Sequence, residues 1–535
     1  MKKLLFLSLA LTAALYLFGR QQSTNYEITP EQKLRMAAVL IESYYVENVN
    51  SDSIVDQAII AMLETLDPHS QYSTPEETAE FSQPLEGKFS GIGIQFSMVE
   101  DTVYVIQPTA GGPSEKVGIR PGDRIISCND TVIAGQKLKN SGILKVLRGP
   151  KGTVANLKIK RLGTDGLIEF RVVRDDIPIY SVDAAYMVTD EVGFISIIRF
   201  GETTAQEVHD AVNRLSRQGM KHLIVDLSGN GGGYLGAAYD IASLFLNPGD
   251  PVVFTRGLHV PDSYFNVETR SDINVDRLVV MVDQYSASAS EIFSGAMQDN
   301  DRGLVVGRRT FGKGLVQRPF PFPDGSMIRL TTSRYYTPTG RCIQKPYTRG
   351  QGDDYQLDML NRYNSGELWH ADSIKVDTTE VYYTLRNHRT VYGGGGIIPD
   401  VFVSVDTSYT SHYYRDLIAR GTLNKFTLNY IEQNRKQLRK QYPNEDALAA
   451  NFEVSQEMLQ ELITVAETDE IPYNEEEFNT SRPLIAAVIK GLMLRDLYEN
   501  GTYVRATNPL NKDFNAALEL ITDPARYNAL LQGKN

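Results

Sequence analysis

Between about residue 180 and residue 405 the chain alternates short aliphatic runs with longer amphipathic stretches. The short runs are rich in β-branched residues, as buried strands are, whereas the longer stretches have the period of helices. This alternation predicts an α/β layer in which helices cover a sheet of buried strands. We expect strands at 192–198, 222–227 and 278–282, and helices at 204–218, 236–246 and 289–298.

The segment before this layer has two parts. Residues 31–80 carry apolar residues at helical spacing with a break at 66–70, after which Thr74 and Pro75 form a cap and first turn. From residue 86 the pattern changes to short β-branched runs between turns, which predicts a small β-rich unit.

The segment from residue 410 to residue 535 is mostly helical, with polar faces. We expect one of its helices to open at Pro483 and to close at Gly501. Just before this region, residues 320–332 resemble a hairpin, with its turn at residues 323–325.

The composition excludes some classes of protein. A net charge of −12 over 535 residues argues against a nucleic-acid-binding protein. Two cysteines, Cys128 and Cys342, are too few for a disulfide framework, and the sequence leaves open whether they pair. The seven histidines do not pair at metal-ligand spacing, so we expect no metal and no cofactor.

The N-terminus has the pattern of a targeting segment. Lys2 and Lys3 precede an apolar run at residues 4–18, and we assign residues 1–20 to a signal peptide or a membrane anchor. The run is shorter than the ~20 residues of a comfortable membrane span, so both alternatives stay open. We expect a periplasmic or other extracytoplasmic location, either free or tethered to the inner membrane.

Three serines alternate with alanines directly after the strand expected at 278–282. Ser288 would lie at a helix N-terminus, where backbone N–H groups lack intrahelical partners and the Ala289 N–H is free to bind an oxyanion. The competing interpretation is that Ser286, Ser288 and Ser290 only cap and turn the chain, which is the commoner role of serines in that position.

Lys313 stands between two glycines, which allow a close approach of the backbone. To act as a base at neutral pH, a lysine must have its pKa lowered from about 10.4 to about 7, which costs about 4 kcal/mol of burial. Gln317 follows four residues later and can accept a hydrogen bond from the amine without protonating it. Taken alone, Lys313 is also compatible with a solvated surface lysine.

A glycine run, DLSGNGGG at 226–233, follows another expected strand. Such a run presents backbone N–H groups, and an amide of Gly232 or Gly233 would complement Ala289 as a second oxyanion donor. A phosphate-binding loop is disfavoured because no Gly-Lys-Ser/Thr ending follows. A tight turn that needs glycines only for positive φ is the competing interpretation.

Separate stretches of the sequence, which occur in the order of the family, resemble the C-terminal processing peptidases, a group of tail-specific serine proteases with a Ser–Lys dyad. SASASE and FGKGLVQ, with Lys313 placed 25 residues after Ser288 (313 − 288), resemble the nucleophile and base segments. DLSGNGGG resembles the oxyanion motif, and LDPHSQY and GGGIIPD, which ends at Asp400, resemble flanking landmarks. The resemblance covers residues 35–405.

By this resemblance Ser288 is the nucleophile, Lys313 the general base and Gln317 the residue that orients the base. The selection of Ser288 over its neighbouring serines rests on the family spacing alone. Ser228 stands where the family has an arginine, which leaves the task of that arginine open in this chain.

Residues 86–176 resemble a PDZ domain. The segment Gly91, Ile92, Gly93 and Ile94 resembles the loop whose amides bind the C-terminal carboxylate of a peptide that adds as a strand. A β-domain whose glycines only make turns is the competing interpretation.

Together the resemblances imply an α/β protease core of crotonase-like ββα units with an inserted β-rich PDZ domain, an N-terminal helical segment and a C-terminal helical extension. The implied activity is that of a secreted serine endopeptidase that cleaves proteins with apolar C-terminal tails near their C-termini. The oligomeric state is left open. The implied domains are a helical segment at 21–85, the PDZ domain at 86–176, the core at 177–405 and the extension at 406–535.

Two rival functions remain. One is a catalytically silent PDZ scaffold that binds C-termini without cutting, and the other is a chymotrypsin-like protease, which the α/β pattern and the lack of a Gly-Asp-Ser-Gly segment disfavour. A histidine-based site would use His209, His222 or His259. Asp299 is interpreted as structural, and His69 as a surface or structural residue.

Overall fold

The computed structural model describes residues 28–99, 101–498 and 503–534, so the predicted signal or anchor at 4–18 lies outside the described residues. The chain forms two compact units, residues 1–66 and 67–535. In the described part of the first unit, α2 (Pro30–Tyr44) begins at a capping box on Thr29 and α3 (Ser51–Glu64) begins at Asn50. No helix within the described ranges is both long and apolar enough to cross a membrane.

The second unit begins with the predicted helix break. After β1 (Gln71–Ser73), Thr74 accepts a hydrogen bond from the backbone N–H of Glu77, and the Glu77 carboxylate accepts one from the N–H of Thr74. This reciprocal cap, with Pro75 in the first turn, starts α4 (Pro75–Glu86) where the sequence predicts it.

A six-stranded sheet forms the centre of the second unit, in the order β10-β11-β12-β15-β16-β21. Its strands run parallel except β10, which pairs antiparallel with β11. Every residue of β11 and β15 is buried, which explains why these strands appear in the sequence as continuous apolar runs. The strands are β10 (Val182–Met187), β11 (Val192–Ile197), β12 (His222–Asp226), β15 (Leu278–Val282), β16 (Leu304–Gly307) and β21 (Val401–Phe402).

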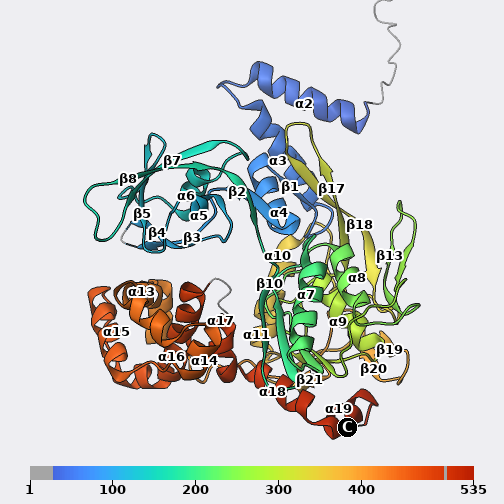
Figure 1. Cartoon of the computed structure of the whole chain (residues 1–535). Coiled ribbons are helices and arrows are strands. Elements are labelled where there is room, and N and C mark those ends of the chain that lie inside the picture. Colours follow the sequence, from blue (N-terminus) through green and yellow to red (C-terminus); the bar gives the residue numbers. More distant parts are fainter. Residues whose placement is uncertain (1–27, 100, 499–502, 535) are drawn as a thin grey trace, which may run out of the picture. The chain divides into compact units, whose positions relative to one another are not determined.

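Helices cover both faces of this sheet (Figure 1). One face packs against α7 (Thr204–Arg217), α8 (Leu235–Ser243) and α9 (Ala289–Asp299). The other face packs against the C-terminal helices α18 (Lys512–Thr522) and α19 (Pro524–Leu531), through side chains that include Phe514, Leu520 and Tyr527. The last helices of the predicted C-terminal extension therefore complete the core of the α/β layer.

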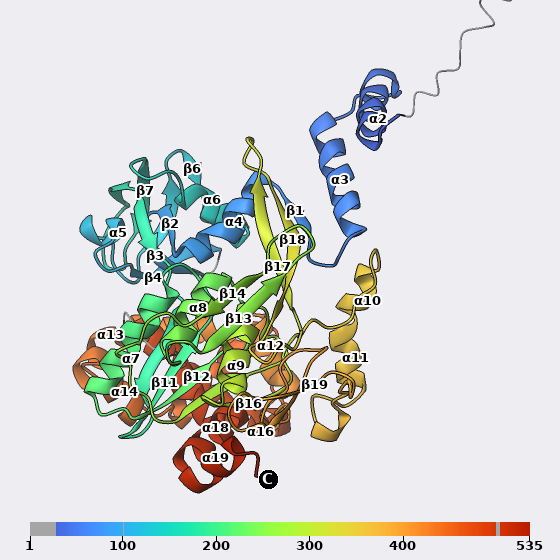
Figure 2. The ribbon, with the colours of Figure 1, turned by 90° about the vertical axis from the view of Figure 1, so that its right-hand side faces the viewer.

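A second sheet, in the order β1-β18-β13-β14 with β17 paired to β18, lies beside this layer (Figure 2). The predicted hairpin is confirmed: β17 (Leu315–Pro321) and β18 (Met327–Tyr336) are joined by a turn in which the Phe322 N–H donates to the Ser326 carbonyl. The other two strands are β13 (Pro251–Arg256) and β14 (Ser263–Asn266). Shorter elements follow, namely α10 (Gly352–Gln356), α11 (Asp358–Asn364), η1 (Ala371–Ser373), β19 (Val381–Tyr383) and β20 (Thr390–Tyr392).

The predicted β-rich unit lies within the second unit and has its own core, in which Ile125, Ile143 and Ile159 are fully buried. Its sheet has the order β3-β4-β5-β7-β8, with β6 paired to β5, and β2 pairs with β9. The strands are β2 (Lys88–Gly91), β3 (Ile94–Val99), β4 (Thr102–Pro108), β5 (Arg124–Cys128), β6 (Thr131–Val132), β7 (Val154–Lys160), β8 (Ile168–Val173) and β9 (Asp175–Pro178). Two helices, α5 (Pro113–Lys116) and α6 (Asn140–Leu147), complete the domain.

The helices between residues 412 and 510 form a bundle with its own apolar core. They are α12 (His412–Ala419), α13 (Thr422–Gln441), α14 (Glu445–Asn451), α15 (Gln456–Thr468) and α16 (Glu475–Leu497), followed by α17 (Tyr503–Thr507) and η2 (Asn508–Leu510). The prediction that Pro483 opens a helix is wrong: α16 begins at the Asn474 cap, with three glutamates in its first turn, and Pro483 lies inside it. Gly501 lies outside the described residues.

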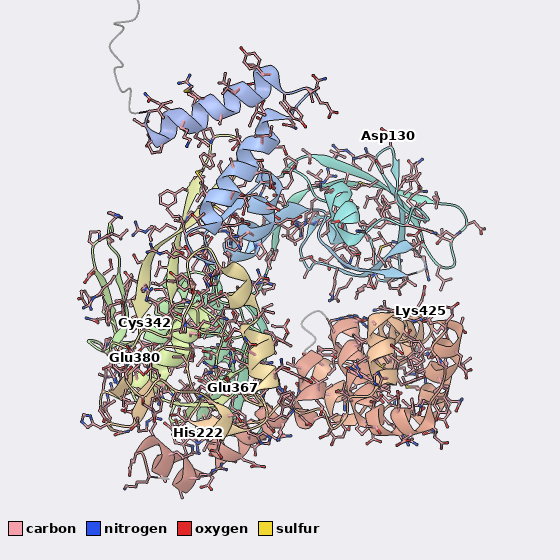
Figure 3. All side chains as sticks on the ribbon, turned by 180° about the vertical axis from the view of Figure 1, so that it is seen from behind. Asp130, His222, Cys342, Glu367, Glu380 and Lys425 are labelled. Atoms are coloured by element: carbon pink, nitrogen blue, oxygen red, sulfur yellow. The ribbon has the colours of Figure 1, made fainter. Side chains whose placement is uncertain are left out.

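One face of α13 contacts the β-domain. Leu428 is buried against Val99, Tyr104 and Ile106, and Arg124 forms two hydrogen bonds of 3.0 Å with the Glu432 carboxylate. Figure 3 labels Asp130 in the β-domain and Lys425 in the bundle.

Candidate active site

The three serines after β15 differ in accessibility. Ser286 and Ser290 are fully buried, and their Oγ atoms each donate a hydrogen bond of 2.8 Å, to the carbonyls of Leu227 and Asn230 respectively. Ser288 alone of the three is partly exposed. The neighbours therefore hold the glycine run in place, which gives a physical reason for the choice of Ser288 that the sequence could not supply.

Ser288 has a strained backbone, with φ 56° and ψ −112° at the N-cap of α9. A non-glycine residue in such a conformation costs about 1–3 kcal/mol, and such residues cluster at functional sites. In this conformation the chain turns into α9, and Ser288 lies in the connection that follows the carboxyl end of the central strand β15.

Glu291 links Ser288 to the loop that carries Lys313, residues 308–314, which we call the lysine loop. Glu291 is not among the site residues predicted from the sequence. Its fully buried carboxylate accepts hydrogen bonds from the N–H groups of Ser288 (2.8 Å), Gly312 (2.7 Å) and Lys313 (2.9 Å), and from the Thr310 hydroxyl (2.5 Å). Burial raises the pKa of Glu291 to about 7, against the opposing effect of these donors. The signal was present as a Ser-x-x-Glu pattern, which is that of a capping box.

Tyr335 makes a second link between the two segments. Its fully buried hydroxyl lies 3.1 Å from the Ser288 carbonyl oxygen and also contacts the carbonyl oxygen of Lys313. Because a phenol has one proton, it donates to one carbonyl at a time. Tyr335 lies on β18, so the second sheet fixes the spacing of the serine and lysine backbones.

Lys313 lies in the loop before β17. Burial is the main cause that lowers the pKa of its amine, and the nearby Arg329 lowers it further. The Nζ atom donates to Gln317 Oε1 at 3.1 Å. A register shift in the β17–β18 ladder falls between Val316 and Gln317, and bulges of this kind re-aim a side chain. The side-chain oxygen of Gln317 therefore contacts the amine of Lys313.

The glycine run differs in one respect from the prediction. Gly232, predicted as an oxyanion donor, has its N–H bonded to Asn230 Oδ1 at 2.8 Å. Its φ of 103° and a hypothetical Cβ 2.8 Å from Ser288 Cβ show instead why a glycine is required: any side chain would collide with the serine. Ala289 is the first residue of α9, as expected.

The structure also defines the surroundings of Ser228, which stands where the resemblance would place an arginine. The Ser228 N–H donates to Asp226 Oδ1 at 2.9 Å, and burial raises the pKa of Asp226 to about 6. Asp513, on α18, adds to that rise and forms an ion pair of 2.8 Å with Arg308.

The other candidates have structural partners. Asp299 forms a fully buried ion pair of 2.6 Å with Arg341, as its structural interpretation requires. His209 bonds to Asp272 and His222 to Arg277, so neither is aligned as a base for Ser288. His259 is exposed.

Among residues 28–99, 101–498 and 503–534, neither Cys128 nor Cys342 forms a disulfide, and no group of three or more histidine, cysteine or acidic side chains could hold a metal ion.

In the β-domain, the predicted carboxylate loop of Gly91, Ile92, Gly93 and Ile94 runs from the last residue of β2 to the first residue of β3. Gly93 has φ 70°, and a Cβ there would approach Ile177 Cδ1 to 2.8 Å. The strand that follows, β3, is at the edge of its sheet, which is where a peptide can add as a further strand.

Comparison with known proteins agrees with this geometry. Residues 191–355 match the family described as Peptidase family S41, residues 90–172 match the PDZ domain, and residues 413–499, which are the helical bundle, match a family of unknown function (DUF8443).

Two relatives and one solved structure illustrate the similarity. The carboxy-terminal processing protease CtpB of Bacillus subtilis (strain 168) is 35% identical over 349 residues, 64% of this chain and 71% of that protein. CtpA of the same organism is 32% identical over 365 residues, 66% and 77%. The photosystem II D1 C-terminal processing protease is 25% identical, with a TM-score of 0.34 over 59% of this chain and 91% of that one.

An α/β layer with a strained serine at a strand end, joined to a PDZ domain, is the plan of a PDZ-containing serine protease. The chain belongs to peptidase family S41, among the carboxy-terminal processing proteases. It is accordingly a serine endopeptidase of a family that cleaves proteins near their C-termini. The crotonase-like description of its core stays a prediction.

Proposed function

We propose that Ser288 is the nucleophile of this peptidase and Lys313 its general base. The observation that carries the proposal is the Glu291 carboxylate, which binds the backbone N–H groups of both residues and so joins the two segments. In the first step the neutral amine of Lys313 removes the Ser288 hydroxyl proton as Oγ attacks the scissile carbonyl. Lys313 then protonates the leaving amine, and water hydrolyses the acyl-enzyme.

The surroundings of Lys313 favour its neutral form. Burial lowers the pKa of the amine, which increases the neutral fraction near pH 7. Gln317 Oε1 accepts a hydrogen bond from Nζ and so orients the amine, while leaving a lone pair for the serine proton.

The oxyanion of the tetrahedral intermediate would be held at the N-terminus of α9. The Ala289 N–H is one donor, supported by the helix dipole. Because the Gly232 N–H is bonded to Asn230, we assign the second donor to Gly233, the next residue of the glycine run. Gly233 is exposed and forms a β-bridge with Phe200.

The PDZ domain would bind the C-terminus of the substrate. The backbone amides of residues 91–94 would bind the terminal carboxylate, and β3 would pair with the tail. Ile94, Phe96 and Met98 pack partly buried against the domain core beside this edge, which favours apolar tails. Lys2, Lys3 and the apolar run at 4–18 support a location outside the cytoplasm.

The test is cleavage of a protein with an apolar C-terminal tail by the wild type and by Ser288→Ala and Lys313→Ala variants. We expect both variants to lose cleavage while they still bind the tail. Equal cleavage by all three would refute the assigned dyad, and tail binding without cleavage by the wild type would favour the silent PDZ scaffold.

A further inference from the structure

Gln317 is held by a chain of hydrogen bonds that leads away from the catalytic pair. Its Nε2 donates to the backbone carbonyl of His69, and the ring Nε2 of His69 lies 2.9 Å from the Tyr355 hydroxyl. The three residues are far apart in the sequence, and these two contacts bring the segments that carry them together beside Lys313. We call Tyr355, His69 and Gln317 the relay.

We infer that His69 and Tyr355 are positioning residues for the general base: they fix the amide of Gln317, which in turn fixes Lys313 Nζ. This inference rests on the proposed roles of Ser288 and Lys313 and adds two residues to them. No proton transfer along the relay is involved, only the placement of one amide.

The His69 end of the relay is anchored by a buried carboxylate. Asp67 Oδ1 accepts hydrogen bonds from the N–H groups of His69 and Ser70, both at 2.9 Å, and its Oδ2 accepts one from the Ser70 hydroxyl at 2.6 Å. The Thr331 hydroxyl on β18 donates to the same carboxylate at 3.0 Å. These bonds fix the turn, and therefore the direction of the His69 carbonyl, against the strand that pairs with β17.

The Tyr355 end is packed against the lysine loop. Its ring meets the ring of Phe311, two residues before Lys313, edge-on with centroids 6.0 Å apart. The Lys345 ammonium lies 4.1 Å and 4.0 Å from the Phe311 and Tyr355 ring centroids and pairs with Asp358 at 2.9 Å. A desolvated cation between two rings holds this segment in one place.

The ionisation states suit a fixed arrangement. Burial, with a smaller contribution from the neighbouring charge of Lys313, lowers the pKa of His69 to about 4. Burial raises the pKa of Tyr355. At neutral pH the ring is therefore neutral and the phenol protonated, which leaves one proton for their hydrogen bond whichever ring tautomer is present.

The experiment is a mutant cycle on the full chain, read as kcat and KM for a tailed substrate. Tyr355→Phe removes only the hydroxyl, and His69→Ala removes the ring but keeps the carbonyl. We expect each to lower kcat about tenfold, because a displaced general base slows the chemical step, with KM unchanged within about twofold. Tyr347→Phe is the matched control, since Tyr347 lies in the same segment with its ring edge-on to Tyr355, and it should keep the wild-type kcat.

The decisive comparison is with Gln317→Ala. If His69 and Tyr355 act through Gln317, the double variants Gln317→Ala/Tyr355→Phe and Gln317→Ala/His69→Ala will be no slower than Gln317→Ala alone. The inference is overturned if the losses in kcat of the single variants multiply in the double variants. An unchanged kcat in Tyr355→Phe, or an equal loss in Tyr347→Phe, would also overturn it. A wild type without Ser288-dependent cleavage would refute the proposed dyad instead, so the two failures are distinguishable.

Discussion

Replacement of Glu291 by glutamine tests the link between the serine and lysine segments. The carboxylate accepts four hydrogen bonds, two on each oxygen: Oε1 binds Thr310 and Gly312, and Oε2 binds Ser288 and Lys313. A glutamine has one acceptor oxygen, so in either orientation its NH₂ group faces two donors.

The magnitude follows from that count. Two buried donors lose their acceptor, and each costs about 1–3 kcal/mol, so Glu291→Gln should lower the free energy of unfolding by roughly 2–6 kcal/mol. In the orientation that places the NH₂ group at the Oε2 position, the N–H groups of Ser288 and Lys313 both lose their acceptor, so both backbones shift. A displacement of about 1 Å at reacting groups costs about a hundredfold in rate, so we expect kcat to fall by about that factor.

The assay combines urea denaturation with steady-state cleavage, corrected for the folded fraction. Asp299→Asn is the matched control, because Asp299 lies on the same helix and pairs with Arg341, away from the lysine loop. It should destabilise the fold and leave kcat per folded molecule near the wild-type value. The reasoning is refuted if Glu291→Gln keeps the wild-type kcat, or if Asp299→Asn loses as much.

Three further predictions follow from the site. Ser286→Ala removes a buried hydroxyl that donates to Leu227, so we expect a loss of about 1–2 kcal/mol in chemical denaturation but retained cleavage, and complete inactivity would assign Ser286 to the chemistry. Gly232→Ala places a methyl group 2.8 Å from Ser288 Cβ at a φ of 103°, so we expect kcat to fall at least tenfold. A fully active variant would show that the backbone around Ser288 can move to accommodate the methyl group. Because burial lowers the pKa of Lys313, the neutral amine increases as pH rises through that lowered pKa, so kcat/KM should rise with pH and then level off; a profile that is flat from about pH 6 to 9 contradicts a lysine base.

Much of the core was predictable because local signals agree with the packing there. The strand at 278–282 has the predicted bounds, because five consecutive apolar residues between turns are typical of a strand that is buried on both faces. Pro75 and Pro323 likewise mark a helix start and a hairpin turn at the positions observed. Pro483 was misread, because the Asn474 cap and three glutamates start the helix earlier and outweigh the proline signal.

The contacts that complete the site were not predictable, because they join segments distant in the chain. Nothing in the pattern of α18 shows that Phe514 covers the second face of the sheet. The contact between the His69 carbonyl and Gln317 spans more than two hundred residues and is made by a backbone atom, which has no sequence signature. Gly232 was recognised as part of the motif, but its role in the close approach to Ser288 appears only in three dimensions.

The most direct test of the central claim is mass spectrometry of the protein after treatment with a fluorophosphonate, which modifies activated serines. We predict a single adduct on the peptide that contains Ser288, formed by the wild type and absent from the folded Lys313→Ala variant. An adduct on another serine, or undiminished labelling of Ser288 without Lys313, would contradict the Ser–Lys assignment.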